Sequence, residues 1–268
     1  MKKKLLPAVL GLAAILAVSC NKSVEESENY YFTTTKSPLD NVSNDVRNWI
    51  GNSYDGVCDS IEINFDLQRE GLSEEAAALI DAEIVAASLG EQYRNMDICD
   101  AMAAFADSLT TAYASDCASC LSKTNETLPP AYFFDQRYNI NAQVFSMGRN
   151  SIQYVISTYS YSGGAHGYSA DYYIAFDRKS GKRITIDDIF SDKSRLKEVL
   201  EQKASEDERT YEDLEMFISP VFLLDEEGIT FLYPPYDIGC YASGEIDLNI
   251  SKEELEGLIK PEAEKYWK

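Results

Sequence analysis

The chain after Pro129-Pro130 is a series of strand-like segments, and this series constrains the fold more than any other feature. The first three segments are YNINAQVFSM (138–147), SIQYVISTYSYS (151–162) and ADYYIAFD (170–177). KRITIDDIF (182–190) follows Ser180-Gly181, a pair typical of a tight turn, so we expect it to be the next strand of an antiparallel hairpin.

Three further segments extend this pattern. SPVFLLDEEGITFLYPP (219–235) contains the turn signal Glu227-Gly228, and EIDLNI (245–250) alternates apolar and polar residues. Upstream, SIEINFDL (60–67) alternates in the same way, with apolar residues at every second position. A period of two is typical of a strand with one buried face, so strands dominate the predicted fold.

Helices are predicted in four places. GLSEEAAALIDAEIVAASLG (71–90) has Ser73 as N-cap and ends at Gly90, and an apolar stripe from Ile98 to Tyr113 indicates a second helix. We also expect a surface helix over residues 194–204, and a last helix between the Ser251/Glu254 capping box and Pro261. Strands in a run with helices set apart predict an α+β fold, an antiparallel sheet with helices packed to one side.

The N-terminus indicates export. Three lysines precede an apolar stretch, Leu5 to Val18, that is shorter than the ~20 residues a membrane-spanning helix needs. The sequence AVSC at residues 17–20 resembles a lipoprotein signal, whose cysteine takes a diacylglycerol and becomes the mature N-terminus. The expectation is therefore a signal peptide over 1–19, lipidation of Cys20, and a lipid anchor that holds the protein to the cell envelope. The polar segment 21–30 (NKSVEESENY) is expected to be a disordered tether.

The net charge of the chain narrows the classes of possible binding partner. The chain has a net charge of −21, and loss of residues 1–19 would leave 21 bases against 45 acids, a net charge of −24. Nucleic acid is therefore excluded as a partner.

Export permits disulfides among Cys58, Cys99, Cys117, Cys120 and Cys240, although Cys99 and Cys117 on one continuous helix would be ~27 Å apart. No histidine cluster or second CxxC completes a metal site at Cys117 and Cys120, so we expect neither metal nor cofactor.

Several blocks resemble known families. YSYSGGAHGYS, FDRKSGKRITIDDIF and DEEGITFLYPPYDIGCYASGEIDLNI resemble the extracytoplasmic domain of the anti-sigma factor RsiV. SIEINFDLQREGLSEEAAALIDAEI is similar to the small domain that precedes both that domain and the deacetylase PdaC. Together, the N-terminal segments and the resemblance divide the chain into four expected parts: a signal peptide (1–19), a tether and lead-in (20–56), a PdaC-type α+β subdomain (57–130) and an RsiV-like domain (131–268). It also implies an envelope domain whose best understood member binds lysozyme.

Two loops hold the candidate binding residues. The first surrounds the only histidine, His166, with Tyr161, Gly163 and Gly164. The simplest interpretation of His166 is structural: its ring forms a hydrogen bond with the turn that orders the flanking strands. A catalytic triad would need a nucleophile at the right spacing from His166. The second loop contains Pro235, Tyr236, Asp237 and Tyr241, in which prolines limit the entropy lost on binding and tyrosines offer wide contact area.

Three functions are consistent with this sequence. The leading hypothesis is a non-enzymatic envelope lipoprotein that binds a macromolecule or glycan, such as a cationic muramidase or peptidoglycan. The first alternative is an enzyme that hydrolyses or modifies cell-wall glycan at His166, and the second is a structural envelope lipoprotein. Adjacent acids at Asp187-Asp188 and Glu226-Glu227 are interpreted as solvated turns rather than a glycosidase pair, so no catalytic residue is assigned.

Overall fold

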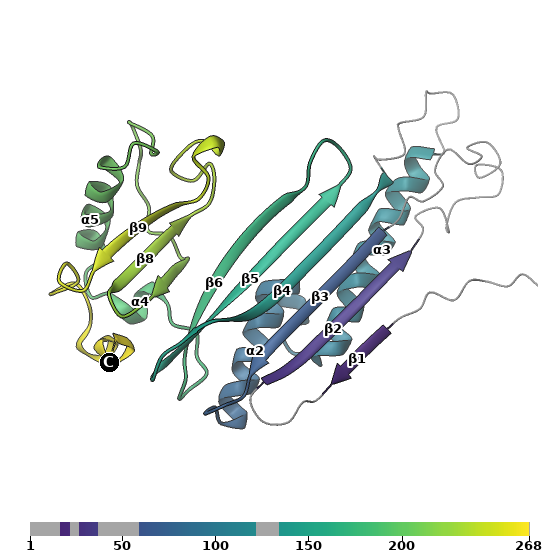
Figure 1. The fold of residues 1–268 in the computed structure, drawn as a ribbon, viewed down its shortest axis with the longest axis horizontal. Helices are drawn as coiled ribbons and strands as arrows, with labels where there is room; N and C mark the ends of the chain where they lie inside the picture. Colours follow the sequence, from purple (N-terminus) through teal and green to yellow (C-terminus); the bar gives the residue numbers. More distant parts are fainter. Residues whose placement is uncertain (1–16, 22–26, 37–58, 122–133, 268) are drawn as a thin grey trace, which may run out of the picture.

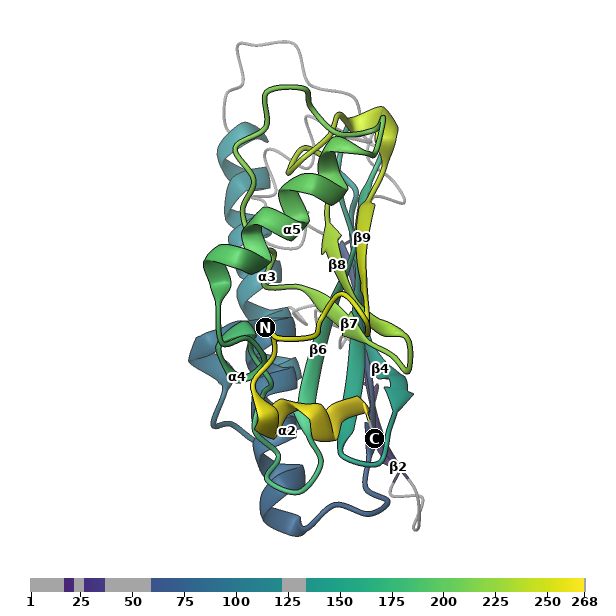
Figure 2. The ribbon, with the colours of Figure 1, turned by 90° about the vertical axis from the view of Figure 1, so that its left-hand side faces the viewer.

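The computed structural model describes residues 17–21, 27–36, 59–121 and 134–267, and they form two sheets with helices on one side (Figures 1 and 2). The larger sheet has the strand order β1-β2-β3-β4-β5-β6. Its strands are β1 (Ala17–Asn21), β2 (Ser27–Lys36), β3 (Asp59–Gln68), β4 (Gln136–Met147), β5 (Ser151–Ser162) and β6 (Tyr168–Asp177). All neighbours are antiparallel except β3 and β4, which are parallel. The predicted α+β class and the position of the helices are confirmed.

Two helices cover one face of this sheet. Helix α2 (Glu74–Leu89) begins where the Ser73 hydroxyl accepts a hydrogen bond from the Ala76 amide (3.1 Å) and ends at Gly90, as predicted. A short 3-10 turn, η3 (Glu91–Tyr93), leads to helix α3 (Ile98–Leu121). Parallel strands need a long crossover, and the α2–α3 segment forms the one between β3 and β4. The apolar side of β3 is fully buried beneath these helices: Ile61, Ile63, Phe65 and Leu67.

The second sheet belongs to the C-terminal part of the chain. It comprises β7 (Phe222–Leu224), β8 (Gly228–Tyr233) and β9 (Ile246–Ser251), in that order and all antiparallel. Helices α4 (Ile186–Ile189) and α5 (Lys193–Ser205) lie on the same side of the molecule as α2 and α3 (Figure 2). Leu196 and Leu200 of α5 are fully buried against this sheet, so the predicted surface helix has an apolar face in the core.

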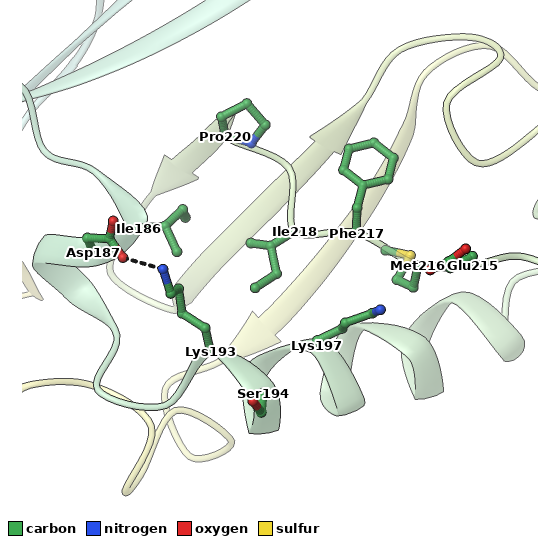
Figure 3. A pocket seen from close by; sticks show the side chains of 10 residues that line it. All are labelled: Ile186, Asp187, Lys193, Ser194, Lys197, Glu215, Met216, Phe217, Ile218 and Pro220. Atoms are coloured by element: carbon green, nitrogen blue, oxygen red, sulfur yellow. Dashed lines mark hydrogen bonds and ion pairs between the residues drawn. The ribbon is translucent and has the colours of Figure 1, made fainter.

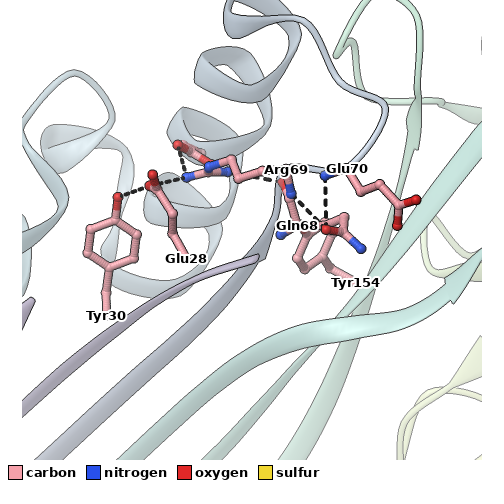
Figure 4. Close-up of polar contacts among 7 residues, drawn as sticks. Glu28, Tyr30, Gln68, Arg69, Glu70 and Tyr154 are labelled. Carbon is pink, nitrogen blue, oxygen red and sulfur yellow. Dashed lines mark hydrogen bonds and ion pairs between the residues drawn. The ribbon is translucent and has the colours of Figure 1, made fainter. Parts of the chain in front are cut away.

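Polar contacts hold the end of β3 against its neighbours (Figure 4). Tyr154 of β5 is fully buried, and its hydroxyl accepts a hydrogen bond from the Gln68 amide (2.8 Å). The Arg69 guanidinium donates to both carboxylate oxygens of Asp81 on α2, each at 2.9 Å, and to Glu28 of β2 at 3.1 Å. These contacts join β2, β3, β5 and α2 at one point.

The expected tether is partly a strand. Ser27 to Tyr30 belong to β2, which pairs with β3 along its whole length, so the prediction of disorder is wrong for these residues. The reason is that Tyr30 and Phe32 face the helix-covered core, and Phe32 is 1% exposed. Most of the predicted signal peptide (1–16), residues 22–26 and 37–58, and Pro129-Pro130 lie outside the described residues.

Two other local predictions are wrong. KRITIDDIF forms a single bridge, Arg183 to Phe176, and then helix α4, because Asp188 accepts hydrogen bonds from the Thr185 amide (2.8 Å) and hydroxyl (2.7 Å) in a capping box. The capping box of Ser251 and Glu254 also forms, but turns follow it instead of a helix. Gly257, with φ of 76°, interrupts that segment, and a 3-10 helix, η6 (Pro261–Trp267), comes only afterwards.

The two hydrophobic cores meet at strand β6. The larger sheet continues across the predicted boundary at 130/131, since β3 pairs with β4. The first core extends to Phe176, and the second begins with Ala175 on the opposite face of β6. Strand β6 therefore contributes to both cores.

Candidate functional site

The first candidate loop is the tip of the β5–β6 hairpin. Gly163 and Gly164 adopt φ of 83° and 97°, backbone conformations that favour glycine. The Tyr161 hydroxyl donates to the Gly164 carbonyl (2.9 Å) and closes the turn. Tyr168, where β6 begins, is 56% exposed. The hairpin therefore presents aromatic side chains on a turn that its own hydrogen bonds hold in place.

His166 lies on this tip with its side chain exposed. Its Nδ1 lies 3.2 Å from the carbonyl oxygen of the adjacent Gly167. Among the described residues, no carboxylate forms a hydrogen bond or ion pair with the ring. The expected hydrogen bond to the turn is present but local, so His166 neither plugs a core nor belongs to a described catalytic cluster.

The second candidate loop joins β8 to β9. Tyr233 anchors its start: the ring is fully buried and the hydroxyl donates to the Phe217 carbonyl (2.9 Å). Desolvation by burial raises the pKa of Tyr233, so this hydroxyl remains protonated. Gly239 is fixed from the other side, because an added Cβ there would lie 2.5 Å from the Arg209 carbonyl oxygen. The loop is thus rigid at its base.

Tyr236 and Tyr241 form a stacked aromatic pair at the tip of this loop. Their ring centroids are 5.7 Å apart and the planes make an angle of 28°. Tyr236 is 68% exposed and Tyr241 is 57% exposed, the two highest values among the exposed large apolar side chains. Tyr236 also has φ of 79°, the one positive φ among the described residues other than glycine. A strained, exposed aromatic residue is a feature of recognition sites.

Acidic side chains meet between the two loops. Glu245, at the end of the β8–β9 loop, has its pKa raised by desolvation and by the carboxylates of Asp171 on β6 and Asp247 on β9. Tyr173 of β6 also has a raised pKa, through desolvation and the charges of Asp171 and Glu245. We call Asp171, Glu245 and Asp247 the acidic trio. Burial and the two neighbouring carboxylates disfavour the charged state of Glu245, so a cationic group placed beside it would be stabilised.

The structure brings some of the predicted residues together and separates others. Both loops lie at the same end of the molecule (Figure 1), and Asp171 of β6 acts electrostatically on Glu245 of the β8–β9 loop. Tyr236 and Tyr241 meet, with Pro235 and Asp237 beside them in the turn closed by the Tyr236 amide and the Gly239 carbonyl (3.0 Å). Sequence reasoning missed Tyr168 and the acidic trio; the trio's members come from β6, from the β8–β9 loop and from β9, and only the fold brings them together.

A separate cavity of about 650 Å³ lies beside α5 (Figure 3). Apolar side chains of the 216–220 segment form one wall, and Lys193 and Lys197 project from α5. Lys193 donates to Asp187 at 2.7 Å, so its charge is compensated, and Asp187 is part of an ion pair rather than an acid–base pair. None of the predicted binding residues lines this cavity.

The cysteines offer no metal site in the described part of the chain. Helix α3 is continuous through Cys99 and Cys117, which excludes a bond between them, as the sequence predicted. Cys99 is disulfide-bonded, whereas Cys117, Cys120 and Cys240 are free. No group of three or more histidine, cysteine or acidic ligands occurs among the described residues. No helix among them is long and apolar enough to cross a membrane.

Known proteins resemble this chain in one region and in overall fold. Residues 187–253, which contain the β8–β9 loop, match a family model described as "Protein of unknown function (DUF3298)". A DUF3298 family member from Bacteroides fragilis shares the fold with a TM-score of 0.67 and 23% identity, over 78% of this chain and 89% of its own. A DUF3298 family protein from Pseudomonas aeruginosa aligns with a TM-score of 0.54 and 15% identity, over 88% of this chain and 95% of its own.

No curated protein matches the chain at a significant level. Because both structural relatives are under 25% identical to this chain, they establish the fold rather than an activity. The matched region extends from α4 to β9. Residues 187–253 therefore match the DUF3298 family model, and the chain shares its fold with solved members of the DUF3298 family.

Proposed function

We propose that this protein is a non-enzymatic binding protein of the cell envelope, anchored by a lipid on Cys20. Its recognition surface would be the end of the molecule formed by the β5–β6 hairpin and the β8–β9 loop. The observation that carries the proposal is the exposed Tyr236–Tyr241 stack beside the acidic trio. Exposed tyrosines on a rigid loop supply contact area at little entropic cost, and the trio selects for positive charge.

The proposed partner is a basic macromolecule, in the first place a wall-degrading enzyme of the lysozyme type. Two features support this choice: the motifs that resemble the extracytoplasmic domain of RsiV, and the net charge of −21. Long-range attraction acts over ~8 Å at physiological salt and raises the association rate more than the affinity. Contacts by the two tyrosines would then have to provide specificity, since acidity alone attracts any basic protein.

A titration of the full chain in detergent would test this proposal. The ligands would be lysozyme and an unrelated protein of similar positive charge, each at low and at physiological salt. We expect saturable lysozyme binding that survives physiological salt and weakens at least about tenfold in Tyr236→Ala. Leu79→Ala, which truncates another exposed apolar side chain (47% exposed, on α2), is the control and should bind like wild type.

A charge-matched pair of variants separates local recognition from general acidity. The first neutralises the acidic trio by D171N, E245Q and D247N, and the second removes the same charge at exposed carboxylates elsewhere by E198Q, E253Q and E256Q. The trio variant should lose lysozyme binding, whereas the second variant should keep it. Equal losses in both variants, or equal binding of both basic proteins, would reduce the interaction to nonspecific electrostatics.

A further inference from the structure

The larger sheet has a second face that helices α2 and α3 do not cover and that is separate from the two candidate loops. We call the face turned away from α2 and α3 the outer face; Figure 1 looks onto it. Side chains alternate along each strand, so residues between the buried core positions of β3, β4 and β5 project outward. The smaller sheet approaches this face along β6: Gln153 of β5 contacts Leu224 of β7, and the charge of Glu245 acts on Asp171 and Tyr173.

Strand register places the outward residues in two straight rows across β2 to β6. The first row is Thr33, Glu62, Asn139, Tyr159 and Ser169; the second row is Tyr31, Asn64, Asn141, Ser157 and Asp171. None of these ten side chains is buried. Ten consecutive cross-strand positions therefore carry hydroxyl, amide or carboxylate groups, with no aliphatic side chain and no Lys or Arg among them.

Hydrogen bonds between neighbouring strands orient these side chains. Glu62 accepts from the Tyr31 hydroxyl (3.0 Å) on one oxygen and from the Asn139 amide (3.1 Å) on the other. Asn64 donates to the Asn141 side-chain oxygen at 2.8 Å. Each amide group has two N–H donors and an oxygen with two lone pairs, so every amide retains both donor and acceptor capacity after these bonds. The rows are a pre-ordered hydrogen-bonding surface.

Aromatic rings flank the amides. Tyr159, in the first row, is 39% exposed, and its ring lies so close to Gly167 that a Cβ there would be 2.5 Å from a ring carbon. The missing side chain of Gly167 thus leaves room for the ring against the backbone. Beside the second row, Phe145 is 49% exposed and packs edge-on against Tyr173, with ring centroids 5.1 Å apart. Rings held this way present apolar platforms next to oriented polar groups.

We propose that the two rows bind a neutral, extended, β-linked polysaccharide chain. Neighbouring strands are ~4.8 Å apart, close to the length of one sugar residue in such a chain, so each sugar would face one strand. The hydroxyl and acetamido groups of such sugars both donate and accept hydrogen bonds, as the side-chain amides of the rows do. The C–H face of a sugar ring would pack on the ring of Tyr159 or Phe145. Glu62 and Asp171 exclude an anionic chain, and a peptide strand would add at a sheet edge rather than on a face.

The binding test uses the full chain in detergent and four soluble probes. They are the hexamer of N-acetylglucosamine and cellohexaose as neutral chains, the glucosamine hexamer as a cationic chain, and heparin as an anionic one. We expect saturable calorimetric binding of at least one neutral hexamer that is insensitive to salt, and none of heparin. Binding of the glucosamine hexamer alone, lost as salt rises, would overturn the proposal in favour of simple charge attraction.

Variants of the row residues test whether the hexamer binds on the outer face. They also separate this site from the lysozyme site proposed on the loops. Tyr159→Ala, and the double variant Asn139→Ala with Asn141→Ala, should each weaken the neutral hexamer by about tenfold or more. Asn249→Ala is the matched control, since Asn249 is an exposed amide on β9 that likewise donates across strands, to Thr230 (2.9 Å). Equal affinity in all variants, absence of binding, or loss of binding only in Tyr236→Ala would each overturn the outer-face site. Lysozyme binding should be unchanged in the double variant of Asn139 and Asn141, which lie on β4 and outside both loops.

Discussion

The side chain of Gln153 forms two hydrogen bonds with the backbone of Leu224. Its Oε1 accepts from the Leu224 amide (2.7 Å) and its Nε2 donates to the Leu224 carbonyl (2.6 Å), and Gln153 is 2% exposed. The side chain thus satisfies a backbone donor and a backbone acceptor at the edge of β7. It joins the outer face of the larger sheet to the smaller sheet, whose strands β8 and β9 are connected by the loop that contains Tyr236 and Tyr241.

Replacement of Gln153 should therefore be costly. Gln153→Ala leaves both groups of Leu224 without partners, and each unsatisfied buried group costs about 1–3 kcal/mol, so we expect a loss of about 3 kcal/mol in the free energy of unfolding. Urea unfolding would measure it. Gln202→Ala, the same substitution at an exposed glutamine on α5, should change stability by less than about 0.5 kcal/mol. Equal stability of the two variants would contradict the structural role of Gln153.

The positive φ of Tyr236 predicts an unusual order of stabilities. Tyr236→Ala and Tyr236→Gly both remove the ring and its stack on Tyr241, but only glycine adopts φ of 79° without steric strain. The glycine variant should be more stable than the alanine variant by about 1 kcal/mol in urea unfolding. An alanine variant at least as stable as the glycine variant would show that the backbone there is not strained.

Glu254 predicts a component of acid sensitivity. Hydrogen bonds from Lys203 and from the Ser251 amide lower its pKa from its usual 4.5 to about 2. A depressed folded-state pKa stabilises the fold above pH 4.5, and this contribution is lost as pH falls from about 4.5 to about 2. Because the side chain is 42% exposed, solvent screening limits the contribution to less than about 1 kcal/mol.

The check on Glu254 is the stability of wild type and Glu254→Gln as a function of pH. The variant should be less stable at neutral pH, and the two curves should converge only below pH 2, where wild-type Glu254 becomes protonated in the folded state. Glu256→Gln is a control, since Glu256 is an exposed neighbour in the same turn segment. A constant difference between wild type and Glu254→Gln over this range would show that the carboxylate does not titrate as described.

His166→Ala should alter stability little. From the sequence alone, a buried ring would predict a loss of ~1 to 3 kcal/mol through an unmatched hydrogen-bond partner. The ring is exposed and contacts only the carbonyl of its neighbour, so the expected change in unfolding free energy is below about 0.5 kcal/mol. A hydrolytic activity on cell-wall fragments that disappears in this well-folded variant would instead favour the enzymatic alternative.

Cys20→Ala should release the protein from membranes. The charged, apolar and small-residue segments of the N-terminus end at this cysteine, and the lipid would be attached to its thiol. Fractionation of cells that express wild type or variant, followed by immunoblotting of pellet and supernatant, would measure the change. Cys240→Ala, which removes an exposed free thiol elsewhere, is the control and should remain in the membrane pellet. A variant that also stays in the pellet would contradict lipid anchoring at Cys20.

Local sequence determined the elements whose signals are complete within a few residues. Ser73 and Gly90 delimit α2 because their caps depend on adjacent backbone groups, and the alternation from Ile61 to Leu67 fixes which side of β3 is buried. The same reasoning failed where a local signal competes with its surroundings. The Ser251–Glu254 capping box forms without a helix, because Gly257 follows within one turn.

Tertiary structure alone decided which distant residues meet. The parallel pairing of β3 with β4, separated by two helices, lines up Glu62 with Asn139, and antiparallel β5 adds Tyr159 to that row. Asp171 and Glu245 are similarly brought together from different sheets. Periodicity shows which face of a strand is outward, but it does not specify strand order or register, because these depend on how the whole set of buried faces packs. The candidate loop with Tyr236 and Tyr241 was therefore visible in the sequence, whereas the acidic trio and the rows of the outer face were not.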